Sequence, residues 1–255
     1  MIEFRLSDQY PPDCPEASFS PCDKESAMES IHNYFLDFFG DTVEHQYVEN
    51  YKEFIPHLPK LSLCILFSPL KPERIGDIEN TEHFLASSPV LKHISMSVAA
   101  PKLFSPESKF WQAESITLTL YSNTVPTFLR HFQGRQAFVT CYKWQDLDLI
   151  AFVNRWKSGK GSRKLETLNL QLISNDIPLN EFLNALGVKR IDESKTPTTH
   201  TLPVMFNLLD TVPIISHSYV VRKTDNRVAS VLIRNESFSF GVWKETEEEF
   251  LRMVK

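Results

Sequence analysis

The sequence predicts an α/β fold: an irregular leucine-rich-repeat-like solenoid of strand–helix units, with a mostly parallel sheet and a C-terminal antiparallel β-hairpin cap. Three observations predict it. Short runs of the form apolar-x-x-apolar-x-apolar recur along the chain, candidate helices lie between them, and turn residues separate two strand-like runs near the C-terminus. In such a solenoid alternate strand residues enter the core, and the helix of each unit covers the outside.

The composition is that of a globular protein. Its 255 residues are 42% hydrophobic, which is enough for a substantial core. A net charge of -5 gives no general excess of the positive charge on which nucleic-acid binding depends, so no nucleic-acid partner is expected. The N-terminus lacks the pattern of a signal peptide, and no apolar run approaches the roughly 20 residues of a bilayer span. We therefore expect no membrane partner, and a cytoplasmic or nuclear location.

The first elements differ sharply in composition. Residues 1–22 carry four prolines among Ser, Asp and Cys, which predicts an irregular proline-rich leader. From Asp23, apolar residues recur at spacings of three and four until Gly40. This pattern predicts an amphipathic helix that ends at the glycine.

Residues 23–187 contain the repeating part. After the first helix, five strand-like runs follow one another at intervals of roughly 20 to 30 residues, a spacing typical of leucine-rich repeats. They are Leu58–Ile65, Leu91–Val98, Ser115–Leu120, Ala137–Cys141 and Leu165–Leu172. Candidate helices fall between or after them, at Asp77–Ala86, Pro106–Ala113, Val125–Phe132, Asp146–Lys157 and Leu179–Leu186.

Residues 188–255 change character. A Thr- and Pro-rich connection leads to two strands, His217–Arg222 and Arg227–Arg234, joined by the turn residues between them, which predicts a hairpin. A third strand, Phe238–Trp243, follows. Thr246 with Glu249 three residues later has the form of a capping box, so a short helix is expected to close the chain.

The cluster Gly159-Lys160-Gly161-Ser162 raises the question of phosphate binding. A phosphate loop follows a strand and opens a helix, whereas here a helix precedes the cluster and a strand follows it. Gly159 is therefore expected to end the helix. The basic residues Lys157, Lys160, Arg163 and Lys164 could meet a phosphorylated or acidic partner, but a helix C-terminus also favours cations, and we prefer that interpretation.

Other chemistry finds little support in the sequence. The eight histidines are scattered, and no H-x-x-x-H, C-x-x-C or G-x-S-x-G motif occurs. We therefore expect no metal, no cofactor and no catalytic residue. The four cysteines are expected to be inert thiols, and the four tryptophans to belong to the core. A catalytic group assembled in space from several loops stays open as an alternative.

A family resemblance rests on the second half of the chain. The helix end Asn154-Arg155-Trp156-Lys157-Ser158-Gly159, then Leu165-Glu166-Thr167-Leu168, and the hairpin from Tyr219 to Ala229 followed by Phe238–Trp243 resemble the F-box-associated domain (type 2) of nematode F-box proteins. That family commonly shows W-x-x-G, then K-L-E, and an R-x-D-G-x-x-A hairpin. Asn226 stands where the glycine of that hairpin usually lies, and an asparagine is compatible with a left-handed turn.

The resemblance implies a protein-interaction module, the substrate-recognition region of a cullin-RING ubiquitin ligase, with an unknown protein as its partner. Residues 1–22 do not resemble an F-box, so binding to the ligase adaptor is expected only if an F-box is supplied upstream. Thr167, Asn169 and Gln171 are the candidate partner-binding residues, because they alternate with leucines on one strand. The alternatives are an α/β enzyme with a dispersed active site and a structural or decaying paralogue without ligase activity.

Overall fold

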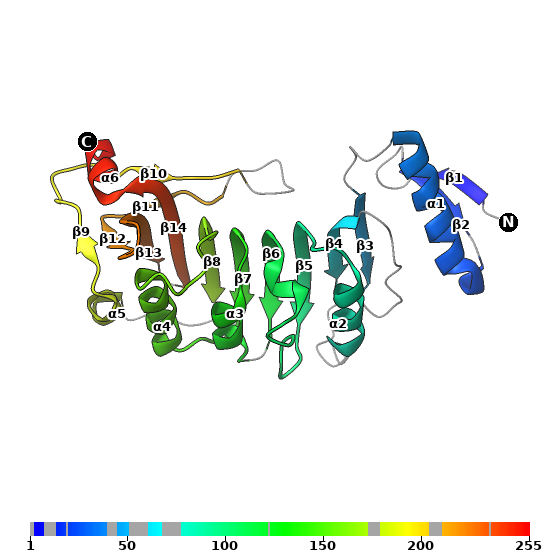
Figure 1. Ribbon diagram of the computed structural model, residues 1–255, viewed down its shortest axis with the longest axis horizontal. Coiled ribbons are helices and arrows are strands. Elements are labelled where there is room, and N and C mark those ends of the chain that lie inside the picture. The colour runs from blue at the N-terminus through cyan, green and yellow to red at the C-terminus, as the bar shows by residue number, and fades with distance from the viewer. Residues whose placement is uncertain are drawn as a thin grey trace.

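The chain folds into an α/β structure with one large mixed sheet (Figure 1). The computed structural model describes residues 3–7, 14–18, 20–39, 45–50, 61–67, 78–121, 123–172, 179–203, 211–234 and 236–255. Within these ranges the sheet has ten strands in the order β3-β4-β5-β6-β7-β8-β14-β13-β12-β9. The predicted α/β class with a largely parallel sheet is confirmed.

The first six strands of this sheet are parallel, and neighbours in the sequence are neighbours in space. Five of them, β4 to β8, coincide with the runs that the repeating pattern predicted, whereas β3 was not predicted because its segment lacks that pattern. Their bounds are β3 His45–Asn50, β4 Leu61–Phe67, β5 His93–Val98, β6 Ser115–Leu120, β7 Gln136–Cys141 and β8 Thr167–Leu172.

Helices follow the parallel strands and lie along one side of the sheet (Figure 1). A right-handed crossover between successive parallel strands places each connection on the same face, provided that the strands are added in one direction. These helices are α2 Ile78–Ser87, α3 Val125–His131, α4 Asp146–Lys157 and α5 Leu179–Leu186.

One predicted helix is reduced to a single turn. Where residues 106–113 were expected to be helical, the structure has only the 3-10 turn Lys109–Gln112. The consecutive residues Phe110 and Trp111 are both fully buried. The Trp111 indole N–H donates to the Ser105 carbonyl at 2.7 Å, and the Phe110 ring stacks on Phe104.

Most of the core lies between the helices and one face of the sheet, and a second buried apolar cluster near the C-terminus contains Trp243, Val228 and Phe250. Alternate residues of the strands are buried, and the strand register places them in continuous rows, such as Ile94, Ile116, Ala137 and Leu168. The prediction that the tryptophans belong to the core is confirmed, because all four side chains are at most 9% exposed.

The C-terminal strands continue the same sheet in antiparallel pairs. Strand β14 pairs antiparallel with β8, and β13 pairs antiparallel with both β14 and β12, so the predicted hairpin is present at the end of the sheet. No break separates it from the parallel strands in the described ranges. The elements are β9 Lys189–Arg190, β12 Ser218–Val221, β13 Arg227–Arg234, β14 Ser237–Thr246 and α6 Glu247–Met253.

The proline-rich leader contains a two-stranded sheet, so the expectation that residues 1–22 are irregular needs correction. Strand β1, Glu3–Ser7, pairs antiparallel with β2, Cys14–Ser18. Proline lacks the N–H of a ladder but is accepted on a strand with one open edge, and Pro15 lies on such a strand, opposite Leu6. The predicted amphipathic helix follows as α1, Lys24–Phe39.

A second small pair of strands forms a strap across the large sheet. We use the name strap for residues 199–203 and 211–216, which include β10, Thr199–His200, and β11, Ile214–Ile215. In Figure 1 the strap runs across the upper ends of β14 and β8. The strap packs on the sheet at Gln136 and Gly241.

Candidate functional site

The face of β5 to β8 that points away from the helices is a candidate interaction surface, which we call the open face. By strand alternation its residues are the ones between the buried apolar positions. The register arranges them in rows that cross the sheet. The rows are His93, Ser115, Gln136 and Thr167; Ser95, Thr117, Phe138 and Asn169; Ser97, Thr119, Thr140 and Gln171; and, just past the strand ends, Tyr121 and Tyr142.

The first of these rows is buried. The Gln136 side-chain amide donates to the Pro203 carbonyl in the strap at 3.0 Å. On β14, Gly241 pairs with Thr167 of β8. The strap leaves no room for a side chain at Gly241, because an added Cβ would stand 2.7 Å from Nδ1 of His200. The strap thus packs on Gln136 and against Gly241, the strand neighbour of Thr167, at the amino-terminal row. In the next rows Thr117 and Gln171 are exposed.

The remaining rows form a neutral surface. They contain hydroxyl and amide side chains together with aromatic rings, and none of their members is Asp, Glu, Lys or Arg. Tyr121 and Tyr142 are 37% and 46% exposed, and their ring centroids are 5.3 Å apart. Phe138 lies half-buried in the middle of the surface. Uncharged surfaces with exposed tyrosines are typical of protein interfaces.

The three residues that the sequence proposed for partner contact lie on this face, but they differ in exposure. Gln171 is exposed and Asn169 is half-buried, with its amide donating to the Ser239 hydroxyl at 3.0 Å. Thr167 is only 2% exposed. The open face can therefore present Asn169 and Gln171 to a partner, whereas Thr167 belongs to the buried row. The exposed tyrosines were missed, because they follow the strands that the pattern identified.

The glycine–lysine–serine loop is not a phosphate loop in the structure. Gly159 has a φ of +77°, and its N–H donates to the Trp156 carbonyl at 2.9 Å. The amides of Lys160 and Gly161 both donate to the Arg155 carbonyl, at 3.0 and 3.2 Å. Because these amides satisfy the last carbonyls of α4, they are not available to cradle an anion.

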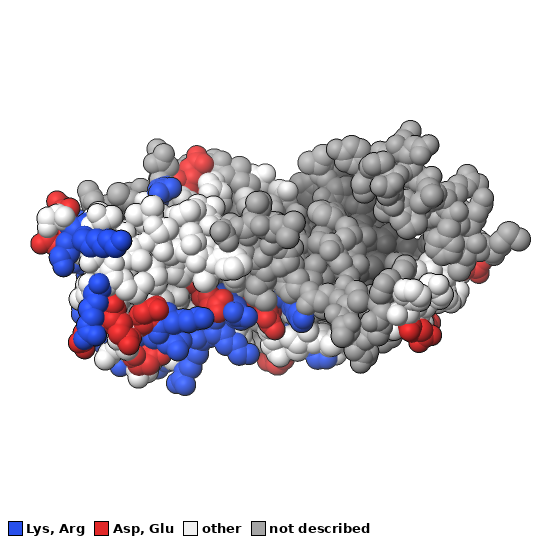
Figure 2. Space-filling view, turned by 90° about the horizontal axis from the view of Figure 1, so that it is seen from above, with Lys and Arg blue, Asp and Glu red and all other residues white. Residues whose placement is uncertain are grey.

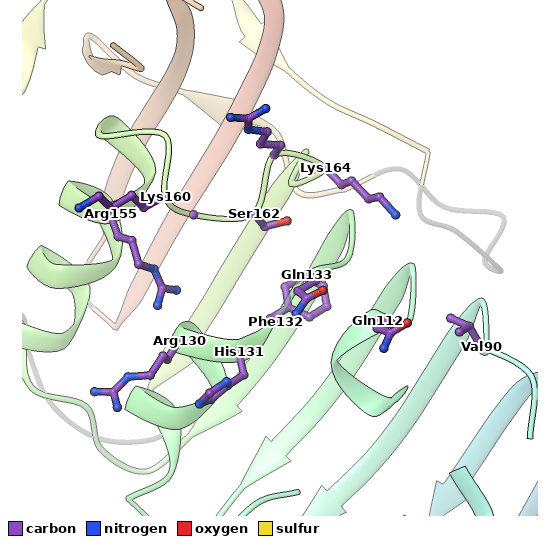
Figure 3. Close-up of a pocket in the computed structure, with 12 residues that line it drawn as sticks. Val90, Gln112, Arg130, His131, Phe132, Gln133, Arg155, Lys160, Ser162 and Lys164 are labelled. Atoms are coloured by element: carbon purple, nitrogen blue, oxygen red, sulfur yellow. The ribbon is translucent and has the colours of Figure 1, made fainter. Parts of the chain in front are cut away.

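The same loop nevertheless forms one side of a second candidate site, a basic cleft. A cavity of about 600 Å³ is lined by residues that precede β5, β6, β7 and β8 and by the ends of α3 and α4. Figure 3 shows Arg155 and Arg130 between the two helices, with Lys164 reaching toward Gln112 and Val90. The cationic members of the lining are Arg130, Arg155, Lys160, Arg163 and Lys164, with His131 beside them. Lys157, the fourth basic residue that the sequence singled out, lies elsewhere and donates to the Leu186 carbonyl of α5 at 2.9 Å.

The positive charges in the cleft are not neutralised by carboxylates. In the described part of the chain, the lining contains no Asp or Glu. Burial and the neighbouring charge of Arg130 lower the pKa of Arg155. A guanidinium N–H of Arg155 donates to the Leu129 carbonyl, while its Nε is buried without a hydrogen-bond partner. The local field therefore favours an anion.

Metal chemistry and chemistry at the Cys141 thiol find no support in the described residues. No group of His, Cys, Asp and Glu side chains there is arranged to hold a metal ion. Burial raises the pKa of the Cys141 thiol to about 12, which makes it a poor nucleophile. The basic cleft opens at the amino ends of the parallel strands, whereas ligands of open α/β sheets usually bind at the carboxyl ends.

Comparisons with family models, with curated proteins and with solved structures find no match to this chain. Among the described helices, none combines the length and the apolar character that crossing a bilayer requires.

Proposed function

We propose that this chain is a non-enzymatic protein-interaction module that binds a partner protein on its open face. The observation that carries the proposal is the uncharged surface of β5 to β8, which combines hydroxyl side chains with Phe138, Tyr121 and Tyr142. The stacking of one parallel strand and one helix or turn per unit supports a solenoid of the leucine-rich-repeat kind. Solenoids use such extended faces for binding other proteins.

The motif resemblance supports a more specific proposal, that the module recognises substrates of a cullin-RING ubiquitin ligase. The residues that carry the resemblance occupy defined places: Trp156 packs its ring on Phe240 at 5.1 Å, and Arg222 stands 4.9 Å from the Trp156 ring. These contacts join α4 to β14 and to the hairpin. In this proposal the shared motifs preserve the frame, while the open face selects the client.

A comparison of variants tests the binding surface. Thr119→Arg places a charge in the centre of the open face, and Asn184→Arg places the same charge on an exposed position of α5. We expect the original chain and Asn184→Arg to retain the same partners from native extract. Thr119→Arg should lose them. If both variants retain the same proteins as the original chain, the open face is not the binding surface.

The ligase part of the proposal has its own test. The abundance and ubiquitylation of each partner defined by that comparison are measured after depletion of this protein. Accumulation of the partner with loss of its ubiquitin conjugates is expected if the module delivers substrates. Unchanged conjugates on a partner that still binds the open face would contradict the ligase role and leave the interaction role in place.

A further inference from the structure

The basic cleft has an electrostatic property that the proposed function does not use. Five cations line it, and no salt bridge of 4.0 Å or less engages any of them in the described part of the chain. At the same edge, Arg135 is paired with Glu166 at 2.7 Å and with Glu114 at 3.7 Å. Two of the acids at this edge are therefore already engaged, and the cleft keeps its charge.

The helix ends explain only part of this arrangement. Arg130 and Arg155 lie in the last turns of α3 and α4, where a cation is favoured by the macrodipole. The dipole acts only within the last turn, and Arg163 and Lys164 lie beyond it in the chain. Burial lowers the pKa of Arg155, and the nearby charge of Arg130, which lines the same cavity, lowers it further by repulsion. An anion in the basic cleft, which both guanidinium groups line, would relieve that repulsion.

The loop after α4 holds the cleft in a fixed shape. Gly161 passes so close to α4 that an added Cβ would stand 3.1 Å from Cα of Trp156. The Ser162 hydroxyl donates to the Gly134 carbonyl at 3.3 Å, which ties the loop to the segment before β7. In Figure 2 the Lys and Arg side chains gather on this part of the surface. The cleft is thus a built feature of the fold.

We propose that the basic cleft is a binding site for a small anion that carries several phosphate groups. Its volume of about 600 Å³ lies within the range of small-ligand sites and exceeds what a single phosphate fills. Arginine binds phosphate oxygens through paired N–H groups, and lysine binds them as a point charge. Gln112, Gln133 and Ser162 add neutral polar groups to the lining. This site is independent of the open face, which lies on the other side of the sheet.

One carboxylate near the cleft defines its inner limit. Asp148 lines a smaller adjoining cavity of about 240 Å³ together with Arg130 and Arg155. Its Oδ2 is buried without a hydrogen-bond partner, and no ion pair joins it to either arginine in the described residues. We therefore place the anion in the larger cavity, which the two arginines and the loop 160–164 line.

Titration calorimetry with inorganic tripolyphosphate tests the proposal on the full chain. Saturable binding with one site is expected at low salt, and competition by sulfate, which carries a single anionic centre, should be weak. The double variant Lys160→Ala/Lys164→Ala is expected to bind at least about tenfold more weakly, because each lost cation removes a phosphate contact. Both side chains are exposed, so the variant should fold normally.

A matched double variant separates a site from general charge. Lys102→Ala/Lys143→Ala removes the same charge from exposed positions outside the cleft and should leave the affinity unchanged. Equal weakening in both double variants, or no saturable binding to the original chain, would overturn the proposal. If the cleft variant changes only the unfolding temperature and not the affinity, the cations serve the helix ends and the proposal is also wrong.

The same chemistry has two sources, a free polyphosphorylated metabolite and a phosphorylated lipid headgroup. Sedimentation with phosphatidylcholine vesicles that contain a phosphatidylinositol bisphosphate distinguishes them. Binding to tripolyphosphate with retention on these vesicles supports a headgroup ligand. Binding to tripolyphosphate without retention supports a free ligand, because the cleft is then not reached by a membrane surface.

Discussion

Arg222 is a buried cation at the turn of the last hairpin. Its side chain is 2% exposed, and Nε donates to Oδ1 of Asp225 at 2.8 Å while a terminal nitrogen donates to Oδ2 at 2.7 Å. This pairing lowers the pKa of Asp225. The guanidinium also stands 4.9 Å from the Trp156 ring. A pair inside the turn thus connects the hairpin to α4.

Asn226 provides the left-handed residue that this turn requires. Its φ is +56°, its N–H donates to the Arg222 carbonyl, and its own carbonyl accepts from Glu247. We expect Asn226→Ala to lower the free energy of unfolding by about 1 kcal/mol, because residues with a Cβ atom, apart from Asn and Asp, are disfavoured at this φ. Asn226→Gly should be neutral or stabilising. Urea unfolding of both variants checks this, and equal stability of the alanine variant would show that the turn adapts.

His93 makes stability depend on pH. Burial lowers its pKa to about 4, and burial also lowers the pKa of His200. The unfolded chain takes up these protons near pH 6.5 and the folded chain does not. The contribution of these two histidines to the free energy of unfolding is therefore most favourable above about pH 6.5, and it becomes less favourable as the pH decreases toward 4. We expect His93→Gln to reduce this slope between about pH 6.5 and 5.

The control for that measurement is His217→Gln, since His217 is exposed. In urea unfolding at several pH values, the free energy of unfolding of His217→Gln should change with pH as it does in the original chain. An unchanged slope in His93→Gln would show that His93 does not contribute.

At the scale of elements, Trp156 fixes α4 on the sheet. The side chain is 1% exposed and packs edge-on against Phe240 of β14. Trp156→Ala is expected to cost about 3 to 5 kcal/mol because it leaves a large cavity. Leu147→Ala, on the same helix but 72% exposed, should change stability by less than about 0.5 kcal/mol. Similar losses in thermal unfolding of the two variants would contradict this packing.

The strap depends on a glycine in β14. An added Cβ at Gly241 would stand 2.7 Å from the His200 ring and 2.9 Å from Ile214. Gly241→Ala should therefore destabilise the protein by about 1 to 3 kcal/mol through overpacking. The substitution should accelerate amide hydrogen exchange in residues 199–203. Exchange in β6, which does not contact Gly241, should stay unchanged. Uniform exchange would show that the strap shifts without loosening.

For the whole molecule, the continuous sheet predicts that the parallel strands and the antiparallel C-terminal strands unfold together. Strand β14 joins the parallel strands to the antiparallel ones, and one core cluster contains residues of both groups, such as Leu170 and Val231. Two variants that keep only Trp111 or only Trp243, with the other tryptophans changed to Phe, report on the two parts of the sheet. Their tryptophan fluorescence should give the same midpoint of urea unfolding. Two separate midpoints would indicate two folding units that meet at β8 and β14.

The sequence by itself determined most of the elements in the repeating part and in the C-terminal hairpin. Alternation in β4 to β8 and the apolar spacing in α4 are local patterns, and Gly159 ends α4 as the local chemistry requires. The 3-10 turn around Trp111 and the pairing of β1 with β2 were not foreseen, because packing in one case and strand partnership in the other overrode local preference.

Only the tertiary structure decided the candidate sites. The sequence placed Thr167, Asn169 and Gln171 on one face, but Thr167 is buried in the row where the strap, which comes from a distant part of the chain, packs on Gln136 and Gly241. Likewise Arg130 joins Lys160 and Lys164 only because helices of successive units end at the same edge of the sheet. Burial and charge depend on atoms brought together from many segments, and a local pattern contains no information on which segments meet.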